Sequence, residues 1–163
     1  IIERSGLARI SAYAGRIPLP GSWPEATKLV RDMNVRAFPS VPDDKWEQIA
    51  RQWFNERNGR PAPGYDPKIG NSLSVLDGPI PALWPQFEAL KIHPLMVLRG
   101  ENSDILSAAT VDEMRRRHPV FTDMVVKGQG HAPLLADKPS ILGISAFLDA
   151  TDGVVGHSLR AIA

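Results

Sequence analysis

Two short apolar runs, each followed by a helical pattern, constrain the fold of this chain more than any other feature. The runs are "PLMVLRG" at residues 94–100 and "VFTDMVV" at residues 120–126. The first is continuous and ends at a glycine, which is typical of a strand buried on both faces of a parallel sheet. A helical pattern follows each run, the second one beginning at Pro139. The order strand, helix, strand, helix predicts a βαβ unit with a closing helix, and therefore an α/β fold.

The first of these helices carries clear end signals. Ser107 is the expected N-cap of "AATVDEMRRRH", and Pro119 stops the helix. Acidic residues come early and basic residues late, as the helix dipole favours. The three arginines at 115–117 are therefore interpreted as a solvated helix end rather than a phosphate site.

The first 92 residues have a different character: they are helical and punctuated by proline, without a convincing strand. Ser22 and Glu25 form a capping-box pattern at the start of one helix. The segment 43–59 predicts a strongly amphipathic helix that Asp43 caps and Gly59 closes. A shorter helix is expected in "IPALWPQFEAL", with four inward apolar residues: Leu83, Trp84, Phe87 and Leu90.

Charge and composition exclude several function classes. The chain has 19 basic and 18 acidic side chains and a formal net charge of +1, so we expect no nucleic-acid or membrane partner. It has no cysteine and no apolar run approaching ~18 residues, and we expect a soluble, cytoplasmic protein. His93, His118 and His157 lack metal-ligand spacing and are expected at the surface or at a strand edge. No metal or organic cofactor is predicted.

Asp104 and His131 are the candidate catalytic residues, because each follows one of the two predicted strands. His131 lies in the turn "KGQGHAPLL" at 127–135. Functional residues gather at the carboxyl ends of parallel strands, and an imidazole that acts as a general base needs a carboxylate at its other nitrogen. The alternative is a turn histidine that bonds a backbone carbonyl. Glu101 is a second candidate for the acid.

The strings "LRGENSD" and "GQGHAP" together resemble the end of an α/β-hydrolase fold enzyme, and segments such as "WPEATKLVRDM" and "YDP" resemble its helical cap. The resemblance implies that Asp104 is the triad acid and His131 the triad histidine. It also implies a partial fold, in which a helical cap precedes the last two parallel strands and their helices. We expect a cap and return segment at 1–92, a core at 93–150 and a tail at 151–163.

The nucleophile that this resemblance requires is not found upstream of Asp104. A serine elbow of the G-x-S-x-G type should precede the acid, but Ser72 and Ser74 lie in "GNSLSVL", without the flanking glycines. Ser158, in "VVGHSLRAIA", follows the histidine and is interpreted as a chance match. We therefore expect the N-terminal half of the fold, with nucleophile and oxyanion hole, to be a separate chain or an unrecorded segment.

The expected function is a hydrolase acting on a small-molecule ester, lactone or related carbonyl substrate through a Ser-His-Asp triad, with this chain incomplete and inactive by itself. Trp23, Trp46 and Trp53 are expected to line an apolar substrate site. Two alternatives stay open. One is a noncatalytic ligand-binding module or inactive fragment. The other is an aspartate nucleophile, as in the dehalogenases and epoxide hydrolases that share the fold.

Overall fold

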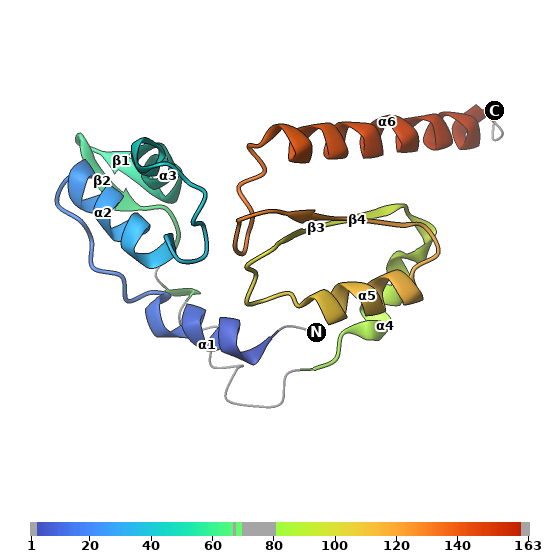
Figure 1. Cartoon of the computed structure of the whole chain (residues 1–163), viewed down its shortest axis with the longest axis horizontal. Coiled ribbons are helices and arrows are strands. Elements are labelled where there is room, and N and C mark those ends of the chain that lie inside the picture. The colour runs from blue at the N-terminus through green and yellow to red at the C-terminus, as the bar shows by residue number, and fades with distance from the viewer. Residues whose placement is uncertain (1–2, 67, 70–80, 161–163) are drawn as a thin grey trace. The chain divides into compact units, whose positions relative to one another are not determined.

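The computed structural model describes residues 3–66, 68–69 and 81–160, with side chains up to residue 152. The chain divides into two compact units, Ile2–Pro81 and Ala82–Ala163. Figure 1 shows the first unit in blue and green and the second in light green to red. None of the helices in the described part of the chain combines the length and the apolar character that a membrane span requires.

The described residues of the N-terminal unit form helices and a hairpin. These elements are α1 (Arg4–Tyr13), α2 (Trp23–Asn34), the 3-10 turn η1 (Asp43–Lys45), α3 (Trp46–Trp53), β1 (Phe54–Arg57) and β2 (Arg60–Pro63). Helices α2 and α3 and the segment between them form its core through apolar side chains that are at most 8% exposed: Ala26, Val30, Phe38, Trp46, Ile49 and Ala50. Burial of this apolar surface is what stabilises helices of such short length.

The predicted start of α2 is confirmed. The Ser22 hydroxyl accepts a hydrogen bond from the Glu25 amide at 3.4 Å, as an N-cap does. The Glu25 carboxylate reaches back to the amide of Gly21 at 2.8 Å, one residue before the cap. The predicted cap at Asp43 was wrong: this carboxylate bonds Arg31 at 3.0 Å instead, and η1 begins without a side-chain cap.

The prediction that no strand occurs before residue 93 was also wrong. Helix α3 ends at Trp53, and the chain then forms the antiparallel hairpin β1–β2, in which Arg57 pairs with Arg60. Asn58 and Gly59 connect the strands with φ values of 51° and 74°. Positive φ at both positions is the requirement of a tight type I′ turn, which Asn-Gly satisfies best. Gly59 therefore turns a hairpin rather than closing a helix.

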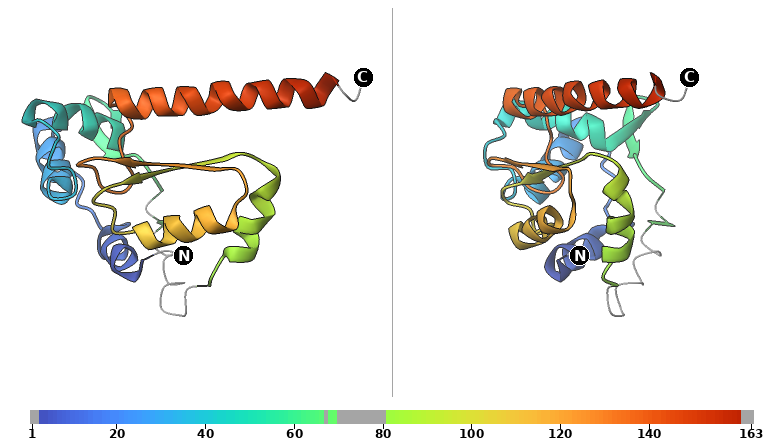
Figure 2. Two further views of the ribbon diagram at one scale, coloured as in Figure 1. Left: turned by 45° about the vertical axis from the view of Figure 1, so that its right-hand side comes forward. Right: turned by 90° about the vertical axis from the view of Figure 1, so that its right-hand side faces the viewer.

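The C-terminal unit contains the predicted α/β core. Its elements are α4 (Trp84–Glu88), the 3-10 turn η3 (Ala89–Ile92), β3 (Leu95–Gly100), α5 (Ala108–Arg117), β4 (Phe121–Val126) and α6 (Lys138–Arg160). Strands β3 and β4 pair in parallel from Leu95↔Phe121 to Gly100↔Val126, which confirms the βαβ unit. Helices α5 and α6 lie on opposite faces of this sheet (Figures 1 and 2). Ser107 caps α5, as predicted, by accepting from the Thr110 amide at 3.2 Å.

The segment before β3 is attached to the end of α5. Arg117 places its guanidinium 4.5 Å from the centroid of the Trp84 ring and bonds Glu88 at 2.8 Å. The aromatic face and the carboxylate both attract this cation. In the structure, residues 82–92 thus belong to the C-terminal unit, and α6 extends through most of the predicted tail. Leu83 and Leu90 are 48% and 44% exposed, so the expectation that both point inward was wrong.

His118 is expected at the surface or at a strand edge; it lies three residues before β4 but is only 4% exposed, so it is not a surface residue. Its Nδ1 accepts a hydrogen bond from the Val120 amide at 3.3 Å. The proton must therefore lie on Nε2, which donates to the Leu90 carbonyl at 3.1 Å. His118 is a buried histidine whose two ring nitrogens connect η3 to the residue before β4.

Candidate active site

The candidate site lies at the carboxyl end of the β3–β4 pair, where two loops begin side by side. The acid loop, residues 101–107, follows β3 and carries Asp104, which is half-buried. The histidine loop, residues 127–137, follows β4 and carries His131, which is exposed. Because Gly100 and Val126 are partners in the strand register, the two loops leave the sheet at the same level.

Backbone hydrogen bonds connect the acid loop to the end of β4 and to the histidine loop. The Glu101 amide donates to the Val126 carbonyl at 2.9 Å, and the Asn102 amide donates to the Gln129 carbonyl at 2.8 Å. The contact at the end of β3 is so close that a Cβ on Gly100 would lie 2.0 Å from the Gly130 carbonyl oxygen. Only glycine permits this approach. The histidine loop therefore rests on the end of β3.

Side chains hold the acid loop in shape on either side of Asp104. The Arg99 Nε donates to the Leu106 carbonyl at 2.7 Å, so a strand side chain is bonded to the far end of the loop. The Ser103 hydroxyl accepts from the Leu106 amide at 3.1 Å. These bonds leave the backbone around Asp104 little freedom to rearrange, which is what a residue that orients an imidazole requires.

The histidine loop is held by a buried side-chain network. Gln129, only 8% exposed, accepts from the Leu134 amide at 2.6 Å and donates to Asp137 at 3.2 Å. Asp137 in turn accepts from the Ser140 amide at 2.9 Å and hydroxyl at 2.7 Å, as an N-cap of α6 does. These hydrogen bonds, from the Ser140 hydroxyl above all, lower the pKa of Asp137 below its ordinary value, so this carboxyl is charged at neutral pH.

Glu101, the second candidate for the acid, has both carboxylate oxygens bonded to the start of the histidine loop. One oxygen pairs with the Lys127 ammonium at 2.8 Å, and the other accepts from the Gly128 amide at 2.9 Å. These contacts, the Lys127 bond first, lower the pKa of Glu101. The arrangement favours a structural role for Glu101, and Asp104 stays the predicted triad acid. The catalytic roles of Asp104 and His131 are predictions, to which the structure adds that their loops are in contact.

The three tryptophans expected to bind substrate have different environments in the N-terminal unit. Trp46 is 1% exposed, and its Nε1 is buried without a hydrogen-bond partner among the described residues. Trp23 is partly buried and lies under the Arg51 guanidinium, 4.2 Å from the ring centroid. Trp53, which is 37% exposed, lines a pocket. We keep Trp53 as the candidate for substrate contact, because its ring is accessible from that pocket.

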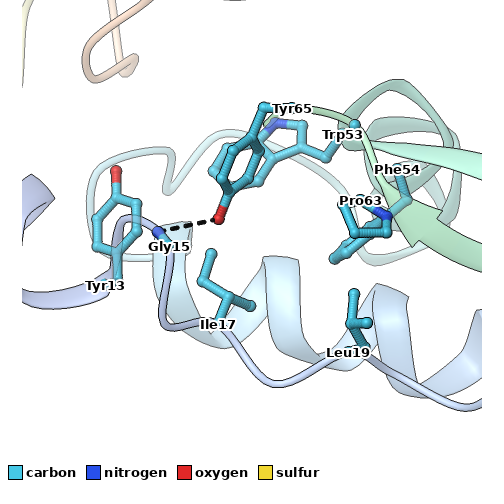
Figure 3. A pocket seen from close by; sticks show the side chains of 9 residues that line it. Tyr13, Gly15, Ile17, Leu19, Trp53, Phe54, Pro63 and Tyr65 are labelled. Atoms are coloured by element: carbon cyan, nitrogen blue, oxygen red, sulfur yellow. Dashed lines mark hydrogen bonds between the residues drawn. The ribbon is translucent and has the colours of Figure 1, made fainter. Parts of the chain in front are cut away.

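This pocket has a volume of about 440 Å³ and lies within the N-terminal unit. Figure 3 shows aromatic and aliphatic side chains around it, with the Tyr65 hydroxyl accepting from the Gly15 amide at 3.4 Å. It is lined by Tyr13, Gly15, Ile17, Leu19, Trp53, Phe54, Pro63, Gly64 and Tyr65. Most of these residues come from segments between helices, where no sequence period identifies the side chains that meet. Sequence reasoning found only Trp53.

Neither a nucleophile elbow nor a metal cluster is present in the described part of the chain. Ser72 and Ser74 lie outside the described residues, and Ser158 lies within α6 rather than at a turn between a strand and a helix. Among the described residues, no group of three or more His, Cys, Asp or Glu side chains is arranged to hold a metal ion.

Comparisons with known proteins agree with this architecture. No protein-family model matches the chain. The chain is 42% identical to the 3-hydroxybutyrate-oligomer hydrolase of Cupriavidus necator, in an alignment that covers 84% of this chain and 49% of that protein. It is 34% identical to an α/β hydrolase from Novosphingobium aromaticivorans, with a TM-score of 0.80 and coverage of 91% and 53%.

E-2-(acetamidomethylene)succinate hydrolase has the same fold at 23% identity and a TM-score of 0.63, again with 91% of this chain and 53% of that chain covered. This chain therefore spans about half the length of the relatives that it matches. The parallel β3–β4 pair, the loops at its carboxyl end and these likenesses lead to one conclusion: the chain belongs to the α/β-hydrolase fold family.

Proposed function

We propose that this chain supplies the acid, the histidine and the substrate-binding cap of a hydrolase that cleaves ester bonds through a Ser-His-Asp triad. The serine would come from polypeptide beyond this sequence. The observation that carries the proposal is the direct bonding of the two loops, in which the Asn102 amide donates to the Gln129 carbonyl at 2.8 Å. An acid and a histidine on joined loops at one sheet end have the arrangement that the triad requires.

In the proposed reaction, the His131 imidazole removes the proton of the serine hydroxyl as its oxygen attacks the carbonyl carbon. The same proton passes from the imidazolium to the leaving alcohol oxygen when the ester bond breaks, which leaves an acyl-enzyme. A water molecule then repeats the two steps and releases the acid. Asp104 accepts a hydrogen bond from the other ring nitrogen and stabilises the imidazolium throughout.

We propose esters of short hydroxy acids, lactones included, as the substrate class. The relative from Cupriavidus necator is named as a hydrolase of 3-hydroxybutyrate oligomers, whose units are joined by ester bonds. The pocket around Trp53 supports an apolar contact, because a lining of aromatic and aliphatic side chains favours an alkyl or aryl part of the substrate. The near-neutral charge of the chain agrees with a substrate that is not strongly ionic.

The test uses the complete active protein with a 3-hydroxybutyrate oligomer and a p-nitrophenyl ester as substrates. His131→Ala and Asp104→Asn should each lower kcat by about 10³-fold or more and leave the thermal midpoint nearly unchanged. Glu101→Gln is the matched control, because it removes the charge of the second candidate acid and keeps an oxygen that can accept from the Gly128 amide. It should retain kcat within about threefold.

A fluorophosphonate probe identifies the nucleophile in the same sample. Labelling of a serine supports the triad, whereas ester hydrolysis without labelling would indicate an aspartate nucleophile. Full activity in both His131→Ala and Asp104→Asn would refute the assigned roles. Substrate binding without turnover in the wild type would support the ligand-binding alternative.

A further inference from the structure

Gln129 is a buried polar side chain that the proposed mechanism does not use. It is 8% exposed and lies in the turn before His131. Buried amides persist in proteins when both of their ends are hydrogen-bonded, and both ends of this one are. Its Oε1 accepts from the Leu134 amide at 2.6 Å, and its Nε2 donates to Asp137 at 3.2 Å.

The two hydrogen-bond partners of the Gln129 side chain lie in different parts of the structure. The bond to Leu134 closes a ring of backbone between residues 129 and 134, and His131 lies on that ring. The bond to Asp137 attaches the ring to the start of α6, where Ser140 is completely buried. The Gln129 backbone carbonyl accepts from Asn102 at 2.8 Å, so the same residue is bonded to the acid loop. One residue thus connects the histidine loop, α6 and the acid loop.

We propose that Gln129 is a positioning residue, whose side chain holds residues 129–134 so that the His131 imidazole keeps a fixed place relative to the acid loop. This inference rests on the proposed catalytic role of His131. Gln129 does not contact the substrate, and it acts through the backbone on which the histidine lies. Small displacements of a catalytic base have large effects on rate, so such a residue is expected to affect turnover more than substrate binding.

The chemistry of the two partners explains why an amide is needed. Leu134 presents an N–H donor and Asp137 presents a carboxylate acceptor, so the side chain between them must accept at one end and donate at the other. The hydrogen bonds from Ser140 lower the pKa of Asp137 and keep it an acceptor at neutral pH. A glutamate in place of Gln129 would keep the shape but place a second negative charge beside Asp137.

An exchange experiment in the complete active protein tests the role of Gln129. Gln129→Glu and Asp137→Asn each disturb the hydrogen bond between these two side chains. The double variant again pairs an amide with a carboxylate, with their positions exchanged. In the double variant, the new carboxylate would accept from the Leu134 amide and from the new side-chain amide, whose oxygen would still accept from the Ser140 amide. We expect each single variant to lower kcat by about 10–100-fold with KM changed less than about twofold. The double variant should recover to within about fivefold of wild type.

Two further measurements do not require turnover. The Cε1–H resonance of His131, followed by NMR through a pH titration, reports the environment of the ring. Amide hydrogen exchange at Leu134 reports the bond that Gln129 makes. We expect the His131 resonance and the Leu134 exchange rate to change in the single variants and to return to their wild-type values in the double variant. If the wild type hydrolyses no ester, the proposed function fails, and these two measurements still decide whether Gln129 positions His131.

The inference is overturned if the single variants keep wild-type kcat and an unchanged His131 resonance. It is equally overturned if the double variant recovers its thermal midpoint but neither kcat nor the resonance, since Gln129 would then serve stability alone. If the single variants fail to fold, the double variant decides the question: it must fold and show the wild-type resonance.

Discussion

The substitution Gly100→Ala tests the contact between the end of β3 and the histidine loop. The added Cβ would lie 2.0 Å from the Gly130 carbonyl oxygen and 2.5 Å from that of Gln129. Ordinary contact begins at about 3.4 Å, so the Gly130 carbonyl would have to move away by roughly 1.4 Å. Both obstructing atoms are backbone carbonyl oxygens, which, unlike side-chain atoms, cannot move away by a change of rotamer. His131 follows Gly130 directly and must move with it.

The expected magnitude follows from this displacement. A shift of about 1 Å in a catalytic group costs about 10²-fold in rate, and forcing an extra methyl into a packed region costs about 1–3 kcal/mol of stability. We therefore expect Gly100→Ala to lower kcat by about 10²-fold and the free energy of unfolding by about 1–3 kcal/mol. Steady-state kinetics on the ester substrate and urea unfolding measure the two quantities.

Gly143→Ala provides the matched control in the same unit. Its Cβ would meet the Met124 sulfur at 3.0 Å, and a methionine side chain can move by the few tenths of an ångström required. Alanine in the middle of α6 also gains about 0.5–1 kcal/mol of helix stability over glycine. This variant should keep wild-type kcat. Wild-type kcat in Gly100→Ala, or an equal loss in both variants, would refute the reasoning that the loop rests on the end of β3.

Two further predictions concern the cap of α6 and the pocket. Ser140→Ala removes a hydrogen bond to a charged group and should cost about 1.5–3 kcal/mol in urea unfolding at pH 7. Because folding lowers the pKa of Asp137 from 3.8, the stabilisation is present above that value and is lost as pH falls through the lowered pKa. The difference between the two proteins should therefore shrink at acid pH, and a constant difference would contradict this origin. Trp53→Ala should raise KM for apolar esters about tenfold, the equivalent of about 1.4 kcal/mol, with kcat little changed. Trp23 lies outside the pocket, so Trp23→Ala should leave KM unchanged. An equal rise of KM in both variants would argue against a specific pocket.

Some features that sequence reasoning missed had a local signal. The dipeptide Asn58-Gly59 is a strong indication of a hairpin, but the apolar spacing from Trp46 to Phe54 favoured a longer helix. In the structure that spacing covers two elements, because Trp53 ends α3 and Phe54 begins β1. Other features had no such signal. His118 lies between the rings of Phe87 and Phe121 and bonds the carbonyl of Leu90, 28 residues before it.

The sequence by itself determined the features that depend on near neighbours along the chain. Helix caps at Ser22 and Ser107 bond amides three residues on, and the two apolar runs, which are typical of parallel strands, indicated β3 and β4. The order of these elements determined the βαβ unit, and the positions after each strand pointed to Asp104 and His131.

Only the tertiary structure decided how these residues are held. The close approach of Gly100 to Gly130, the bond from Asn102 to Gln129 and the pocket around Trp53 join segments that are distant in sequence. These contacts form only when the fold brings the segments together, so no sequence period or short motif predicts them. Nothing in the sequence distinguishes Gly100 or Gln129 from other glycines and glutamines, because their roles depend on contacts with the backbone of another loop.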